Sequence, residues 1–166
     1  MSAQPVAIRA IDDADWPQVY AIFRDIVAQG ETYAYTDTLT TDEAKALWIA
    51  GPLGETVVAL VDDAILGTAT FGPNRPGRGA HVSTASFMVA KEARGQGIGR
   101  ALCELAIARM KERGFVGMQF NAVVSTNSIA IELYRTLGFV TIGTVPGAFD
   151  SASQGRVGLD IMYLEF

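Results

Sequence analysis

The sequence predicts an α/β protein built on one mixed sheet with helices on both faces. Short apolar runs rich in β-branched residues indicate strands, and longer segments with apolar side chains at helical spacing indicate helices. Their order along the chain is β-α-α-β-β-β-α-β-α-β-β. The chain has 166 residues, of which 49% are hydrophobic, so we expect a single domain spanning residues 1–166 with a substantial core.

A strand and a helix are predicted at the start of the chain. Residues 6–11 alternate weakly between apolar and polar side chains, as a half-buried strand does. The helix that follows, at about residues 16–28, carries four apolar side chains on one face: Val19, Ile22, Phe23 and Ile26. Asp12 or Asp15 can cap its first turn, and Gly30 suits the left-handed residue that ends many helices.

A second helix and a hairpin are predicted next. The helix runs from Thr40 or Thr41 to about residue 50, and acidic residues near its start complement the helix dipole. Two apolar runs at 55–61 and 64–71 are separated only by a pair of aspartates. This pattern predicts two strands joined by a tight turn.

The second half of the chain alternates strands with helices. Strands are predicted at 81–90, 115–124, 139–145 and 157–164, helices at about 97–111 and at 127–137, and loops at 72–79 and 146–155. The two loops are assigned from their glycine and proline content.

Composition excludes several classes of function. The formal net charge of −5 argues against nonspecific nucleic-acid binding, which depends on clustered lysine and arginine. No apolar run approaches the roughly 20 residues that a membrane-spanning helix needs. One histidine and one cysteine cannot supply a zinc site of the usual kind, so we expect no metal.

Cysteine usage and the first residues of the chain favour a cytoplasmic protein. Cys103 is the only cysteine, so no disulfide can form within the chain. The segment Met1-Ser-Ala-Gln-Pro has neither the basic patch nor the apolar block of a secretory signal. We expect Cys103 to be a small buried side chain rather than a carrier of the acyl group.

A glycine-rich turn between a predicted strand and a predicted helix is the most informative motif. It reads Arg94-Gly95-Gln96-Gly97-Ile98-Gly99-Arg100. The first N–H groups of a helix have no partners within the helix and lie at the positive end of its dipole. Because glycines let a phosphate approach the backbone closely, the segment predicts a pyrophosphate cradle.

The spacing of these glycines separates the cradle from two other nucleotide motifs. A P-loop requires Lys-Ser or Lys-Thr after its last glycine, and a dinucleotide fingerprint requires glycines at its first, third and sixth positions. This segment meets neither requirement. The remaining pattern, Arg/Gln-x-x-Gly-x-Gly/Ala, resembles the pyrophosphate loop of the GNAT superfamily of acetyl-CoA-dependent N-acetyltransferases. A second segment, Asn127-Ser-Ile-Ala-Ile-Glu-Leu-Tyr-Arg-Thr-Leu-Gly-Phe139, resembles another motif of that superfamily in the expected order and at the expected distance.

The resemblance covers most of the chain, well from Ile65 onward and weakly before it. It implies a single mixed, mostly antiparallel sheet of about seven strands, the GNAT fold. The resemblance is closest to the phosphinothricin and methionine-sulfoximine type of N-acetyltransferase. It implies a direct transfer of acetyl from acetyl-CoA to the amine of a small amino-acid-like substrate, and a homodimer.

The resemblance also assigns the groups that hold acetyl-CoA. Backbone groups of Phe87, Met88 and Val89 would pair with the pantetheine arm, and one N–H would polarise the thioester carbonyl. The N–H groups from Gly95 to Arg100 would bind the diphosphate. The side chains of Arg94 and Arg100 either contribute charge or stay in solvent.

Tyr134 is the candidate general acid. It matches the position that protonates the departing thiolate in many relatives, and a phenol with a reference pKa of about 10 is protonated at neutral pH. A packed aromatic side chain on an amphipathic helix is the alternative reading. Asn127, at the start of the same helix, either caps it or contacts the cofactor.

The general base is open, because the sequence departs from its relatives here. Many of them carry a glutamate on the strand before the cradle, but this chain has His81-Val-Ser-Thr-Ala-Ser86. His81 has a suitable reference pKa of about 6.5, although a lone histidine at a strand start is more often structural. Glu31 is a second candidate, and a water chain without a dedicated base is a third.

The acceptor site is predicted from a loop and three aromatic residues. Arg75 or Arg78 would form a fork for the carboxylate of an amino-acid-like acceptor, and an exposed loop position is the alternative for both. The side chains expected to wall the pocket are Tyr33, Tyr35 and Phe149. Acetylation of a protein N-terminus or lysine, and a non-catalytic CoA-binding regulatory module, are the competing functions.

Overall fold

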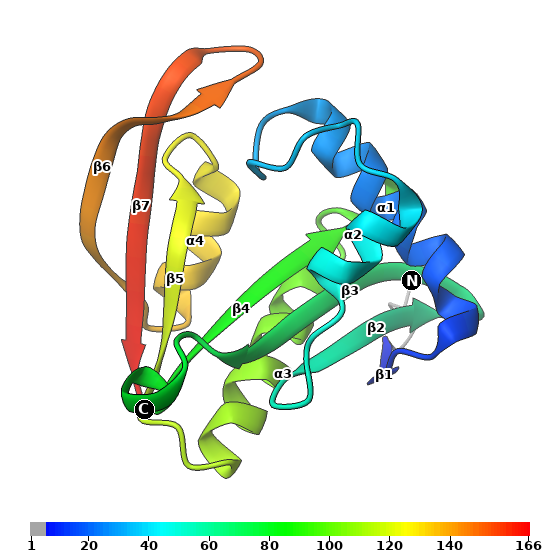
Figure 1. Ribbon diagram of the computed structural model, residues 1–166, viewed down its shortest axis with the longest axis horizontal. Helices are drawn as coiled ribbons and strands as arrows, with labels where there is room; N and C mark the ends of the chain where they lie inside the picture. The colour runs from blue at the N-terminus through cyan, green and yellow to red at the C-terminus, as the bar shows by residue number, and fades with distance from the viewer. Residues whose placement is uncertain (1–5) are drawn as a thin grey trace.

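The computed structural model describes residues 6–166 and is built on one seven-stranded sheet, whose strand order is β1-β2-β3-β4-β5-β7-β6 (Figure 1). Every neighbouring pair is antiparallel except β4 and β5. The predicted mixed, mostly antiparallel sheet is therefore confirmed.

The observed elements follow the predicted order closely. The strands are β1 (Ala7–Ala10), β2 (Glu55–Val61), β3 (Ala64–Pro73), β4 (Val82–Val89), β5 (Gly117–Val124), β6 (Val140–Ser151) and β7 (Gly155–Glu165). The α-helices are α1 (Trp16–Gln29), α2 (Thr41–Trp48), α3 (Ile98–Glu112) and α4 (Ser128–Thr136).

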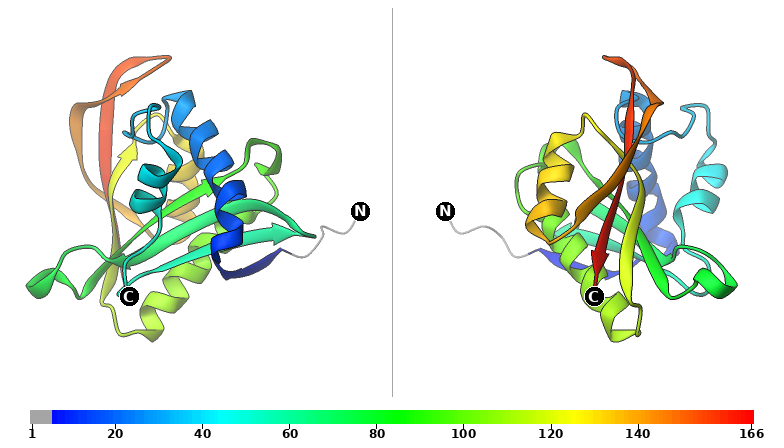
Figure 2. Two further views of the ribbon diagram at one scale, coloured as in Figure 1. Left: turned by 45° about the vertical axis from the view of Figure 1, so that its right-hand side comes forward. Right: turned by 90° about the vertical axis from the view of Figure 1, so that its left-hand side faces the viewer.

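Helices cover both faces of the sheet. Figures 1 and 2 show α1 and α2 on one face and α3 and α4 on the other. Buried apolar side chains of α1, α2 and α3 pack against the sheet in one continuous core. In the part of the chain that the structure describes, no helix has the length and apolarity to cross a membrane.

The predicted bounds of the first helix are confirmed, but the two aspartates expected to cap it cap a 3₁₀ turn just before it. Asp12 accepts a hydrogen bond from the backbone N–H of Ala14, and Asp15 accepts one from the N–H of Asp12. These bonds cap a short 3₁₀ turn that leads directly into α1. Gly30 adopts the left-handed conformation, with φ 66°, and ends the helix.

The parallel strands β4 and β5 separate soon after they meet. They pair only at Val82 with Gly117 and at Ser83 with Met118. Beyond these pairs β4 turns away from β5, as Figure 1 shows, while β3 and β7 continue to pair with their outer edges. The result is a V-shaped opening in the sheet, and the inner edge of β4 has no strand beside it.

The predicted loop at 146–155 is wrong, because β6 continues to Ser151 and forms a long hairpin with β7. Pro146 and Gly147 indicated a loop, but β6 is the edge strand, where a proline need not supply a ladder hydrogen bond. The register shifts between Val145 and Phe149, and Gly147 has φ 60° within this bulge.

The tip of the β6–β7 hairpin is clasped to the end of α1. The N–H of Ala152 donates to the carbonyl of Gly30 at 3.0 Å. The Glu31 carboxylate accepts one hydrogen bond from the Ser151 hydroxyl, at 2.6 Å, and another from the Ser153 N–H, at 2.9 Å. We call these contacts the clasp. They join the hairpin on one side of the V to the end of α1, which packs on β3 and β4 on the other side.

Gly67 of β3 lets α3 lie directly on the sheet. A Cβ at this position would stand 2.7 Å from Cγ2 of Ile98 and 3.1 Å from Cδ1 of Leu102. Both side chains are buried in the core, so neither has free space to move into. The absence of a side chain at Gly67 thus sets how closely the first turn of α3 approaches β3.

Replacing Gly67 by valine should lower the free energy of unfolding by about 1–3 kcal/mol, because overpacking forces α3 away from β3. Urea denaturation followed by circular dichroism measures the change. Gly51→Val is the matched control, since no atom lies within 4 Å of a Cβ at Gly51. Equal stability of the two variants would contradict this account of the α3 contact.

Candidate active site

The glycine-rich turn has the geometry of an anion cradle. Gly95 and Gly97 have φ values of 78° and 82°, and a Cβ at either residue would point into open space. Gly97 is the N-cap of α3, with no side-chain cap. None of the N–H groups from Gly95 through Arg100 donates a hydrogen bond to another described residue. These free donors fit a diphosphate.

The cradle lies beside apolar side chains of β4 and α4. A Cβ at Gly99 would lie 3.7 Å from Cγ2 of Val89 in β4 and 3.8 Å from Cδ2 of Leu133 in α4. These are ordinary van der Waals distances, so an alanine would fit there. The start of α3 therefore packs between the end of β4 and α4.

The two arginines that flank the cradle have partners of their own. Arg94 donates to the side-chain carbonyl of Gln29 at 3.3 Å. Arg100 donates to Oγ1 of Thr136 at 2.7 Å and forms an ion pair with Glu104 at 3.4 Å. Both arginines are exposed. Gln96 donates its amide to the carbonyl of Glu92.

The inner edge of β4 presents the backbone groups of its odd-numbered residues. The N–H of Ala90 donates to the carbonyl of Leu66, and the carbonyl of Val82 accepts from the N–H of Asn74. The backbone N–H and carbonyl groups of the even-numbered residues of β4 therefore point toward β3. The N–H and carbonyl groups of Phe87 and Val89 therefore point into the V. Such an edge can pair with an extended ligand.

Tyr33 occupies this edge at Phe87. Its hydroxyl donates to the Phe87 carbonyl at 2.7 Å and accepts from the Phe87 N–H at 3.1 Å. Burial raises the pKa of Tyr33, so the phenol is protonated at neutral pH. The sequence predicts Tyr33 as a pocket wall, but nothing in the local pattern indicates this bond across 54 positions.

Tyr134 lies in an aromatic cluster that fills the V on the α4 side. Its ring centroid is 4.5 Å from that of Phe120, 5.9 Å from that of Phe139 and 6.3 Å from that of Phe87. Burial raises the pKa of Tyr134 well above its usual value, and the nearby Tyr33 and Cys103 raise it further. Its hydroxyl bonds to no side chain or backbone group in residues 6–166, so its proton is available.

Two further predicted residues have structural roles in this region. The Asn127 side chain caps α4 by accepting from the N–H of Ala130 at 3.4 Å. Cys103 of α3 is fully buried, and burial raises the pKa of its thiol to about 12. Such a thiol is inert as a nucleophile at neutral pH.

The two candidate bases lie apart from Tyr134. His81 is exposed and precedes the N-terminal end of β4, and its carbonyl accepts from the N–H of Val116. Six residues of extended chain, roughly 20 Å, separate it from Phe87. Glu31 is engaged in the clasp, where the hydrogen bonds from Ser151 and Ser153 lower the pKa of its carboxyl.

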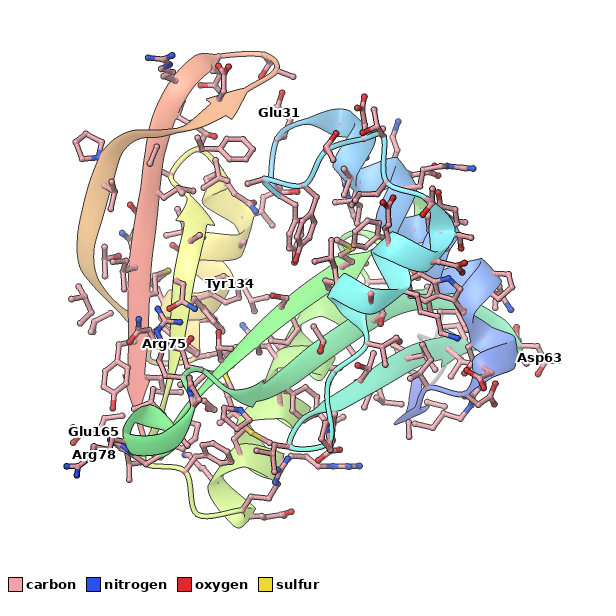
Figure 3. All side chains as sticks on the ribbon, viewed as in Figure 1. Glu31, Asp63, Arg75, Arg78, Tyr134 and Glu165 are labelled. Carbon is pink, nitrogen blue, oxygen red and sulfur yellow. The ribbon has the colours of Figure 1, made fainter. Side chains whose placement is uncertain are left out.

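The two arginines of the predicted carboxylate fork differ in placement. Figure 3 shows Arg75 and Arg78 at the end of the molecule opposite Glu31, with Tyr134 between. Arg75 follows β3, and its guanidinium donates to the backbone and side-chain carbonyls of Asn74. Arg78 lies in the exposed 3₁₀ turn at Gly77–Gly79.

An amide cluster positions Arg75, and sequence reasoning missed it. The side chains of Asn74 and Asn121 donate to one another, at 3.3 and 2.7 Å, and Gln119 donates to Asn121 at 2.9 Å. These bonds join the end of β3 to β5. Asn121 and Gln119 alternate with the buried Phe120, which is the pattern of a strand with one polar face. The sequence shows that alternation, but it does not indicate that Asn74 is the hydrogen-bond partner of Asn121.

The aromatic residues predicted to wall an acceptor pocket lie on two sides of the open end. Tyr33 stacks on Tyr35, with ring centroids 5.7 Å apart, and both rings belong to the segment after α1. Phe149 of β6 is buried, and it shares its face of the strand with Ser151, the clasp residue two positions later. Among the described residues, no group of three or more histidine, cysteine, aspartate or glutamate side chains could hold a metal ion.

Comparison with known proteins agrees with this geometry. Residues 16–139 match the acetyltransferase (GNAT) family. A GCN5-related N-acetyltransferase from Kribbella flavida has 50% sequence identity and a TM-score of 0.94, with 97% of this chain and 98% of that chain covered. A phosphinothricin acetyltransferase from Sinorhizobium meliloti, solved in complex with AcCoA, has 25% identity and a TM-score of 0.87, with 97% and 88% covered.

Two curated relatives extend the comparison. An L-methionine sulfoximine/L-methionine sulfone acetyltransferase from Pseudomonas paraeruginosa is 32% identical over 146 residues, which are 84% of this chain and 83% of that protein. Protein SPT10 from Saccharomyces cerevisiae is 39% identical over 83 residues, half of this chain but only 13% of SPT10. The chain belongs to the GNAT family of acetyltransferases, the class of acetyl-CoA-dependent N-acetyltransferases that its two motifs predict.

Proposed function

We propose that this protein transfers acetyl from acetyl-CoA to the primary amine of a small amino-acid-like substrate. The observation that carries the proposal is the continuity of the free N–H groups of the cradle with the strand-free edge of β4. This edge leads from Val89 to Phe87, beside Tyr134. The names of the sulfoximine and phosphinothricin acetyltransferases favour a small amino-acid-like acceptor.

The chemistry assigns one role to each group. Acetyl-CoA supplies the acetyl group as a thioester; a C–N bond forms to the amine, the C–S bond breaks, and the thiolate accepts a proton. The N–H of Phe87 would stabilise the negative charge that develops on the carbonyl oxygen. Tyr134 would donate the proton, since its raised pKa keeps the hydroxyl protonated until the thiolate forms.

Water is the proposed route for the proton that the amine loses. Glu31 is a poor base because its carboxylate is hydrogen-bonded and its pKa is lowered, and His81 lies at the other end of β4. The polar β4 side chains that face away from α4 are Thr84 and Ser86, whose hydroxyls can order water but cannot act as bases at neutral pH.

A closed pocket is proposed for the acceptor. Tyr33, Tyr35 and Phe149 would form its walls, and the clasp would restrict access at the open end of the V. A peptide substrate needs an open groove, so the clasp favours a small acceptor over a protein N-terminus or lysine. Arg75, oriented by Asn74, would bind the acceptor's carboxylate.

We also propose that the protein acts as a cytoplasmic homodimer of this single domain. A cytoplasmic location is supported by the lone, buried, unpaired thiol of Cys103. The homodimer is supported by exposed apolar side chains on the edge strand β6, namely Val140, Ile142 and Val145, which are 58%, 63% and 49% exposed.

Replacing Gly97 by tryptophan should abolish detectable acetyl-CoA binding in titration calorimetry, because the bulky side chain would stand where the diphosphate approaches the backbone. Gly114→Trp is the control. Gly114 lies just past the other end of α3, also has a positive φ, and also has open space beyond its Cα. Unchanged affinity in the Gly97 variant would refute the cradle.

A thiol-release screen of amino acids, their analogues, polyamines and peptides then identifies the acceptor.

Replacing Tyr134 by phenylalanine should lower kcat by about 10²-fold or more while acetyl-CoA affinity changes little, because the ring packing is retained and only the proton donor is lost. Steady-state assays with a thiol reagent measure kcat, and calorimetry measures the affinity. A variant with the wild-type kcat would leave Tyr134 with a packing role alone.

Replacing Arg75 by alanine should raise the KM for a carboxylate-bearing amine by about three- to tenfold, since one exposed charge-assisted contact is lost. The KM for the corresponding amide should stay the same. Parallel steady-state assays with the two acceptors make the comparison. An equal rise for both would show that Arg75 does not recognise the carboxylate.

A further inference from the structure

We propose that Tyr33 is a displaceable occupant of the donor site: its hydroxyl holds the position on Phe87 that the acetyl carbonyl of acetyl-CoA takes. The proposal deepens the function given above and rests on the role assigned there to the Phe87 N–H. It makes Tyr33 a competitor of the acetyl group, in addition to its place in the acceptor wall.

The geometry of the Tyr33 hydroxyl is that of a substitute ligand. One oxygen accepts from the N–H of Phe87 at 3.1 Å and donates to the carbonyl of the same residue at 2.7 Å. Both groups point into the V, where no strand can satisfy them. A thioester carbonyl that accepts the Phe87 N–H must lie where the Tyr33 oxygen lies, because one N–H directs its acceptor to one place.

Tyr33 also approaches the proposed acid. Burial is the main cause of the raised pKa of Tyr134, and the nearby Tyr33 phenol raises it further. The Phe87 ring contacts Tyr134 on the α4 side, while Tyr33 approaches the Phe87 backbone from the α1 and α2 side. The point that Tyr33 fills is thus the point where the acetyl group must stand for Tyr134 to reach its sulfur.

Tyr33 belongs to a segment that is fixed on both sides of the V. Its ring stacks on Tyr35 and packs edge-on against Trp48, with centroids 6.1 Å apart. Two residues earlier, Glu31 is bound to the hairpin tip by the clasp. Figure 3 shows Glu31 at that open end, above the level of Tyr134. Displacing the hydroxyl therefore shifts an acceptor-pocket wall when the donor enters.

A consequence concerns donor and product. Acetyl-CoA has the carbonyl that replaces the hydroxyl, so its binding must break both Tyr33 bonds. CoA has lost that carbonyl, so Tyr33 keeps or regains its place beside the free thiol. Tyr33 thus weakens the binding of acetyl-CoA, leaves the binding of CoA unchanged, and restores the closed edge after each transfer.

Titration calorimetry with Tyr33→Phe tests the competition. The substitution removes the hydroxyl and keeps the ring, so acetyl-CoA should bind about three- to tenfold more tightly, the equivalent of about one lost intramolecular hydrogen bond. The Kd for CoA should change by less than about twofold. Tyr35→Phe is the matched control for acetyl-CoA affinity. It lies in the same stack, and its hydroxyl has no hydrogen bond to β4.

Amide hydrogen exchange at Phe87 gives an independent readout. In the free wild-type protein this N–H should be protected by Tyr33, and in Tyr33→Phe it should exchange faster. Saturating acetyl-CoA should protect it in both proteins. Thermal denaturation of both variants checks that they are folded.

The outcomes separate the two proposals. Wild-type protein that does not bind acetyl-CoA overturns the proposed function and, with it, the role of Tyr33. Wild-type protein that binds acetyl-CoA, beside a folded Tyr33→Phe that binds it equally or more weakly, overturns the role of Tyr33 alone. An equal gain for acetyl-CoA and CoA also overturns it, because the competition requires the acetyl carbonyl.

Discussion

The separation of β4 from β5 after two residue pairs is the constraint on which the rest of the structure depends. A buried strand edge cannot leave its N–H and carbonyl groups without partners at no cost. At Phe87 the Tyr33 hydroxyl supplies both partners. Behind the edge, the rings of Phe87, Phe120 and Tyr134 fill the wedge that the diverging strands open. The opening is thus stabilised from both faces of the sheet while no strand pairs with its inner edge.

The cradle depends on the same opening. Because α3 begins within ten residues of the end of β4, the free N–H groups of its first turn lie at the end of the free edge. Gly67 allows the helix to lie close to β3, and Gly99 places the start of the helix beside the side chains of Val89 in β4 and Leu133 in α4. An extended ligand bound to the edge and an anion bound to the helix can therefore belong to one molecule.

The parts of the site that the sequence predicts are the local ones. The cradle and the α4 motif each consist of consecutive residues. The apolar spacing of α1 predicts a helix without reference to any distant residue. The Tyr33–Phe87 bond spans 54 positions and the Ser151–Glu31 bond spans 120, so no periodicity reports them. The loop prediction at 146–155 is wrong for a related reason: proline and glycine indicate a loop locally, but an edge strand with a bulge accommodates both.

The clasp also argues against Glu31 as the general base. A carboxylate that accepts hydrogen bonds from a hydroxyl and a backbone N–H is stabilised in its charged form, which makes it a weaker base. If Glu31 took the amine proton, the hydrogen bonds that close the open end of the V would weaken at the moment of transfer. A carboxylate that holds the site closed and a base that accepts a proton in each turnover have opposite requirements. In this chain the geometry at Glu31 satisfies the first, which supports the proposed route of the proton through water.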